Sequence, residues 1–120
     1  MGHAKFIFPN SFDIYLHDTP NKDLFANANR AQSHGCIRVA KPDSLAYFLL
    51  RNQPEWTPAK IASVMKDDKE QKVEIKNPVP VAITYYTAWI DKSGKLNFRK
   101  DIYSHDKKTL EKMFVSTTSI

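Results

Sequence analysis

The sequence predicts an α+β fold with a mainly antiparallel β-sheet core and several short helices. Two observations lead to this prediction. Short runs rich in β-branched and aromatic residues lie between turn-forming clusters, and segments with apolar residues at helical spacing separate two groups of these runs. A chain of 120 residues, 42% of them hydrophobic, can bury one core but is too short for two. We therefore expect a single domain over residues 1–120.

The first expected strand pair lies near the start of the chain. Residues 5–8 and 13–17 are rich in β-forming side chains, and a turn-forming cluster at 9–11 separates them. This pattern is typical of paired strands, with His17 at the end of the second strand. Further β-like runs end at Val39 or cover residues 72–76, 79–90 and 96–103, the last two joined by a turn at 91–95.

Three helices are expected. Pro42 suits the first turn of a helix, and Leu45, Ala46, Phe48 and Leu49 follow at helical spacing before Pro54 ends the pattern. Thr57 is a suitable N-cap for a second helix that runs to about residue 65. A third helix is expected over residues 105–114, with Leu110, Met113 and Phe114 spaced to dock.

Charge and hydropathy exclude several classes of function. The net charge is +5, but the lysines are spread along the chain and form no basic block, so a nucleic-acid partner is not expected. No apolar run approaches the roughly 18 to 20 residues that a membrane span needs. The first residues show no secretory signal.

The densest chemistry lies in residues 13–39, around the single cysteine. One cysteine excludes an internal disulfide, so Cys36 is either buried apolar filler or a thiol kept for its reactivity. A thiol with an ordinary pKa of about 8.5 is mostly protonated at neutral pH, so a nucleophile needs a basic neighbour. His34, two residues earlier, and His17, at a strand end, are the two candidates. Gly35 allows a tight turn that could direct backbone N–H groups towards an oxyanion.

Other roles remain open for the same side chains. His17, His34 and Cys36 could supply three zinc ligands, but no fourth ligand or familiar zinc spacing accompanies them, so no metal is expected. His3 and His105 are expected to be ordinary surface or core residues.

These residues form a motif that resembles the L,D-transpeptidase (YkuD-type) catalytic domain. That family carries a His, about fifteen residues, and then Ser/Thr-His-Gly-Cys, a hydrophobic residue and Asn or Arg. Here His17 is followed by fifteen residues and then by Ser33-His34-Gly35-Cys36-Ile37-Arg38. Three further segments look like the larger Gram-negative enzymes of the family: Lys5 to Asn10, Tyr15 to Pro20 and Thr87 to Ile90.

The resemblance implies a cysteine acyl transfer on peptidoglycan. Cys36 would attack the stem tetrapeptide, forming an acyl-enzyme with loss of D-alanine, and an amine of a second stem would then form a 3→3 cross-link. His17 matches the family base, with its ring held by a backbone carbonyl that Asp18 could provide, and His34 matches the supporting histidine. Gly35 and Cys36 would supply oxyanion N–H groups.

Three further residues in or near the motif could contribute to the site. By the resemblance, Ser33 helps to fix the loop. Arg38 could bind a substrate carboxylate or brace the loop through an internal ion pair, and bracing is slightly favoured. Tyr15 shares a strand face with His17 and borders the substrate groove, unless it only packs in the sheet.

The resemblance also implies partners and a location. Peptidoglycan stem peptides are the expected substrates, carbapenem β-lactams the expected inhibitors, no cofactor is required, and the periplasm or cell envelope is the expected location. The chain corresponds to the C-terminal part of the family domain, without its N-terminal strands. Three alternatives stay open: an L,D-carboxypeptidase with water as acceptor, a catalytically impaired wall-binding fragment, and a cysteine peptidase of unrelated fold.

Overall fold

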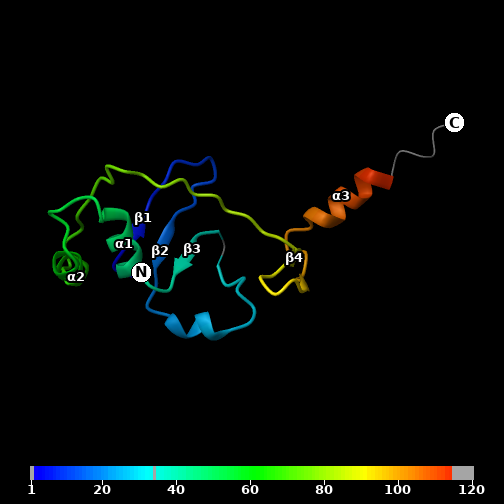
Figure 1. The fold of residues 1–120 in the computed structure, drawn as a ribbon, viewed down its shortest axis with the longest axis horizontal. Coiled ribbons are helices and arrows are strands. Elements are labelled where there is room, and N and C mark those ends of the chain that lie inside the picture. Colours follow the sequence, from blue (N-terminus) through cyan, green and yellow to red (C-terminus); the bar gives the residue numbers. More distant parts are fainter. Residues whose placement is uncertain (1, 34, 115–120) are drawn as a thin grey trace. The chain divides into compact units, whose positions relative to one another are not determined.

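The computed structural model describes residues 2–33 and 35–114. The chain divides into two compact units, Met1–Val81 and Ala82–Ile120. Its described part contains three α-helices, one 3₁₀ helix and two small sheets, which confirms the α+β class (Figure 1). None of these helices has the length and apolar composition that crossing a lipid bilayer requires.

The first unit contains a three-stranded sheet of β1 (Lys5–Phe6), β2 (Leu16–Asp18) and β3 (Ile37–Val39), in that order. β1 and β2 are antiparallel, as predicted. β2 and β3 are parallel, an exception to the mainly antiparallel pairing that was expected. The chain between them includes the 3₁₀ helix η1 (Lys22–Ala26) and is long enough for the crossover that a parallel pair needs.

The strands of the first pair are shorter than predicted because a side chain organises the turn between them. Asn10 Oδ1 accepts the N–H groups of Phe12 and Ile14, each at 3.0 Å, and Asn10 Nδ2 donates to the carbonyls of Phe8 and Ile14. These bonds take backbone groups that would otherwise extend the ladder. They also hold Asp13 at a positive φ of 53°, a conformation that Asp adopts more readily than most residues.

Two helices provide the core of this unit. α1 (Pro42–Leu50) and α2 (Pro58–Lys66) begin where the prolines predict, and the Thr57 side chain caps α2 by accepting from Lys60 N at 3.2 Å. Ala46, Leu50 and Ile61 are the buried apolar residues of the described chain. Partly buried side chains pack against them: Phe6, Trp56, Met65, Val73 and Ile75.

The expected strand over residues 72–76 is wrong. Gln53 is buried after α1, and its side chain bonds to the backbone of this segment, with Lys76 N–H donating to Oε1 at 3.0 Å and Nε2 donating to Glu74 O at 3.2 Å. Val73 and Ile75 still pack on the core. An amide side chain has therefore replaced the neighbouring strand that a ladder would need.

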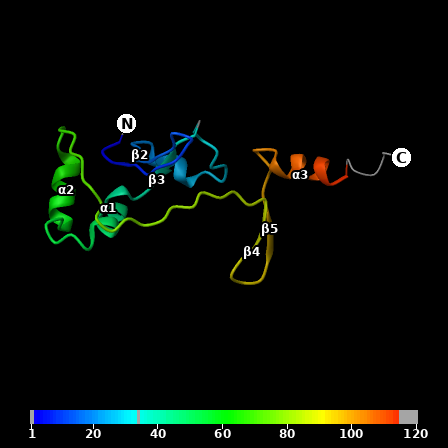
Figure 2. The same cartoon turned by 90° about the horizontal axis from the view of Figure 1, so that it is seen from above.

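The second unit contains a hairpin of β4 (Ala88–Ile90) and β5 (Leu96–Phe98), shown in Figure 2. Both strands are shorter than predicted. Asp91 closes the turn, because its carboxylate accepts N–H groups from Ser93 and Lys95 and an amide proton from Asn97. Gly94 has a φ of 79°, which glycine tolerates without strain.

The last helix, α3 (His105–Phe114), forms where predicted. The Asp101 carboxylate accepts the N–H groups of His105 and Lys107 at its start. The apolar residues that were expected to dock are exposed among the described residues: Leu110, Met113 and Phe114.

The stability of the hairpin turn should fall at acidic pH. Hydrogen bonds from Ser93, Asn97 and Lys95 lower the pKa of Asp91 to about 2, whereas an unfolded aspartate has a pKa of about 3.9. A lowered folded pKa stabilises the turn above the unfolded value, and this contribution is lost as the pH falls through the folded value. The NMR chemical shifts of residues 88–98 should therefore stay constant above about pH 4 and move to unfolded values as the pH falls towards 2. In Asp91→Asn this acid transition should disappear, and its persistence would contradict the assignment.

Candidate active site

The side chains of the sheet in the first unit alternate between two faces, and one face packs on the core through Phe6. Its register places Lys5, His17 and Arg38 in one row and Phe6, Leu16 and Ile37 in the next. Neighbouring rows point to opposite faces of a sheet. Since Phe6 packs against the core, the row that contains His17 lies on the face away from the core.

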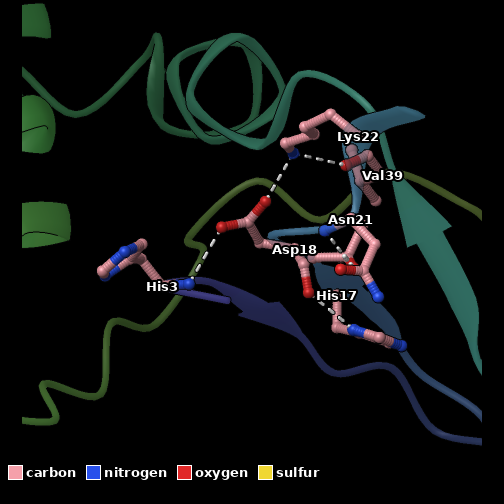
Figure 3. A network of polar contacts seen from close by, with 7 residues as sticks. His3, His17, Asp18, Asn21, Lys22 and Val39 are labelled. Carbon is pink, nitrogen blue, oxygen red and sulfur yellow. Dashed lines mark hydrogen bonds and ion pairs between the residues drawn. The ribbon is translucent and has the colours of Figure 1, made fainter. Parts of the chain in front are cut away.

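The ring of His17 is fixed by the next residue. Its Nδ1 lies 2.7 Å from the Asp18 carbonyl oxygen (Figure 3). A carbonyl can only accept, so Nδ1 must carry the proton in this hydrogen bond. The neutral ring then has its lone pair on Nε2, which is the form that a general base requires.

Cys36 comes directly before β3 and is half-buried. Alternation along the strand places it on the same face as Arg38, two residues later, which is the register partner of His17. Ile37 N donates to Tyr15 O at 3.1 Å, so the ladder continues to this point. Cys36 is therefore diagonal to His17 across neighbouring strands, with Cα atoms roughly 8 Å apart from strand spacing and rise.

The loop before Cys36 is held by a serine. Ser33 Oγ donates to the Cys36 carbonyl at 2.5 Å and accepts the Gly35 N–H at 3.4 Å. Ser33 is therefore bonded to the backbone of both Gly35 and Cys36, the nucleophile candidate. The expected supporting residue His34 lies outside the described residues.

Tyr15 borders the same face. Its ring centroid lies 5.8 Å from that of His17, and Lys5 Nζ lies 4.6 Å from the tyrosine ring centroid. The arrangement gives the face around His17 an aromatic wall with a cation above it.

The ion pair by which Arg38 would brace the loop, the role that the sequence slightly favoured, is not found among the described residues. Within residues 2–33 and 35–114 Arg38 Nη1 is buried and has no hydrogen-bond partner. Arg38 also lines a cavity of about 230 Å³. A buried guanidinium nitrogen without a partner is costly, so this geometry suits an anionic ligand that supplies the missing acceptor. The cavity is lined by Leu24, Phe25, Arg30, Gln32, Ser33, Ile37 and Arg38.

The Asp18 side chain lies on the opposite side of the strand from His17, as Figure 3 shows. It is buried and accepts His3 N–H at 2.9 Å and Lys22 Nζ at 2.6 Å. Burial raises the pKa of this carboxyl, but hydrogen bonds from Lys22, His3 and Thr19 and the lysine charge outweigh burial, so the pKa is lowered. Asp18 thus contributes its carbonyl to the His17 side, and its carboxylate is engaged elsewhere.

The zinc alternative concerned His17, His34 and Cys36. No three His, Cys, Asp or Glu side chains in the part of the chain that the structure describes lie close enough to hold an ion. His34, one of the three ligands of that alternative, is not among the described residues, so the zinc alternative is not tested.

Lys22 was missed by the sequence analysis. It contacts Asp18 and the Val39 carbonyl, at the ends of β2 and β3. The only signal in the sequence is the four-residue spacing from Asp18, which has meaning on a helix but not across a strand end.

Comparisons with known proteins indicate a family for this chain. Residues 1–81 match the L,D-transpeptidase catalytic domain of the YkuD family. The chain is also similar to a Haemophilus influenzae protein named "Putative L,D-transpeptidase", with 43% identity over 107 residues. The aligned part is 89% of this chain but 22% of the relative, so the chain spans about a fifth of that protein's length.

Removal of the His17 imidazole should slow alkylation of Cys36. In His17→Ala we expect at least about a tenfold lower rate with iodoacetamide at pH 7, because the base on the same face is lost. His34→Ala should have a smaller effect, through loop geometry. His105→Ala, in the second unit, is the control and should react like the parent. A larger effect for His34→Ala would reverse the two roles.

Proposed function

Because the chain belongs to the L,D-transpeptidase catalytic-domain family, we propose that it performs cysteine acyl transfer on peptidoglycan stem peptides. One observation supports this most directly: the hydrogen bond from His17 Nδ1 to the Asp18 carbonyl. It leaves Nε2 as the proton acceptor, on the sheet face that Cys36 shares through the β2–β3 register.

In the first step, Nε2 of His17 takes the thiol proton, and the Cys36 sulfur attacks the carbonyl that joins the third stem residue to the terminal D-alanine. The carbonyl oxygen becomes an oxyanion, which the Gly35 and Cys36 amides would stabilise. The Gly35 amide would exchange its long bond with Ser33 for this oxygen. The C–N bond then breaks, D-alanine leaves with the proton from His17, and a thioester remains on Cys36.

In the second step, the side-chain amine of another stem attacks the thioester. His17 accepts the amine proton and returns it to the departing sulfur, which yields a 3→3 cross-link and free Cys36. Water as acceptor would give a carboxypeptidase, the alternative for the same acyl-enzyme. The acceptor and the activity of the whole protein are part of the proposal, as is a periplasmic or cell-envelope location.

Arg38 would bind a substrate carboxylate. Stem peptides carry carboxylates at the D-alanine end and on diaminopimelate, and the buried Nη1 offers a donor without a protein acceptor in the described chain. Tyr15, beside His17, would form a wall of the groove.

A carbapenem tests the nucleophile. Incubation of the parent should add the mass of one drug molecule, located on the peptide that contains Cys36. Cys36→Ala should give no adduct and keep its fold, since a thiol-to-methyl change removes few contacts. An adduct on this variant, or none on the parent, would refute the assignment. The latter result would favour the impaired wall-binding fragment.

Arg38→Met should weaken carbapenem binding, because these drugs carry a carboxylate. We expect about a tenfold higher inhibition constant with a smaller change in acylation rate, as removal of a charge-assisted hydrogen bond costs about 1.5 to 3 kcal/mol. Arg51→Met is the matched control, because Arg51 lies on the Phe48 ring at the end of α1. Equal effects in both variants would exclude a carboxylate-binding role.

A further inference from the structure

The ammonium of Lys22 joins the ends of the two strands that support the site. Lys22 Nζ lies 2.6 Å from Asp18 Oδ1 and 3.3 Å from the Val39 carbonyl oxygen (Figure 3). Asp18 and Val39 are direct register partners, the last residues of β2 and β3. One cation therefore holds together strands that are only three residues long.

The same contacts fix the residue that holds His17. The Asp18 carboxylate has two acceptor oxygens in use: Oδ1 with Lys22 and Oδ2 with the His3 N–H at 2.9 Å. Its backbone N–H donates to Ala4 O at 2.8 Å. With side chain and amide both bonded, the orientation of the following carbonyl is set, and this carbonyl accepts from His17 Nδ1.

The environment of this ion pair distinguishes it from an ordinary surface pair. The Asp18 side chain is 9% exposed, whereas in the second pair of the described residues, Lys76 and Glu55, the carboxylate side chain is 46% exposed and the contact is 3.7 Å. Exposed pairs contribute little because water screens them. An almost buried carboxylate that lost its lysine would instead turn towards water or take up a proton.

We propose that Asp18 and Lys22 are positioning residues that hold the catalytic base His17 in its Nδ1–H form and orientation, acting through the Asp18 carbonyl. The inference rests on the proposed function for the role of His17 as base. Loss of the lysine frees the Asp18 peptide to rotate, so the imidazole loses its fixed acceptor. Nε2 then carries the lone pair for only part of the time.

The test uses Lys22→Met, which keeps the length of the side chain but not its charge. Carbapenem acylation of Cys36 is followed by mass spectrometry, with titration of the reactive fraction. We expect about a tenfold lower acylation rate constant per reactive site and an inhibition constant within about twofold of the parent, because misplacement of a base affects the chemical step. Lys22→Arg should restore the rate, and Lys76→Met, which removes the exposed pair, should leave it unchanged. Asp18→Asn is the second variant, should Lys22→Met fail to fold.

A spectroscopic measurement makes the result independent of acylation. ¹⁵N shifts of the neutral His17 ring should show one Nδ1–H form in the parent and a mixture of forms in Lys22→Met. If the titrated fraction falls while the rate constant and the ring shifts stay unchanged, the pair only supports the fold and the proposal is wrong. If the parent is not acylated at all, the proposed function fails, and the ring shifts alone decide: a mixture supports the positioning role and an unchanged single form overturns it.

Discussion

The parallel pairing of β2 with β3 is the constraint on which the site depends. It makes Arg38 the register partner of His17 and brings Cys36 to the same face of the sheet. A shift of one residue in this pairing would send Cys36 to the opposite face, towards the helices, because side chains alternate with a period of two. Three-residue strands do not define a register strongly by themselves, so contacts at their ends, such as those of Lys22 and Asp18, gain importance.

The two faces of this small sheet have separate tasks. One face carries Phe6, which packs on the core formed by Ala46, Leu50 and Ile61. The other face carries the candidate catalytic residues. Their polar groups would be costly to bury without partners in a packed core. Asp18 serves both sides, since its buried carboxylate stabilises the strand ends and its carbonyl orients His17. Asp18 therefore contributes both to the stability of the sheet and to the geometry of the site.

The family match and the architecture coincide. The matched region, residues 1–81, corresponds to the first compact unit, and all residues of the proposed site lie within it. The hairpin and α3 of the second unit contribute none of these residues, although similarity to the Haemophilus influenzae protein covers most of the chain. Length and composition predict one domain over residues 1–120, which stays a prediction, and the structure groups the chain into two compact units.

The sequence by itself determined the α+β class, the helix starts at Pro42 and Pro58, the Thr57 cap and the spacing from His17 to Cys36. These features depend on local conformation or on a motif of adjacent residues, which a linear sequence contains in full. Only the tertiary structure decided the parallel pairing, the loss of the strand at residues 72–76, the contacts of Lys22, and the Arg38 nitrogen that has no partner among the described residues. Each of these depends on which distant group, if any, takes a hydrogen bond. Many residues can donate or accept such a bond, so only the fold selects the pair.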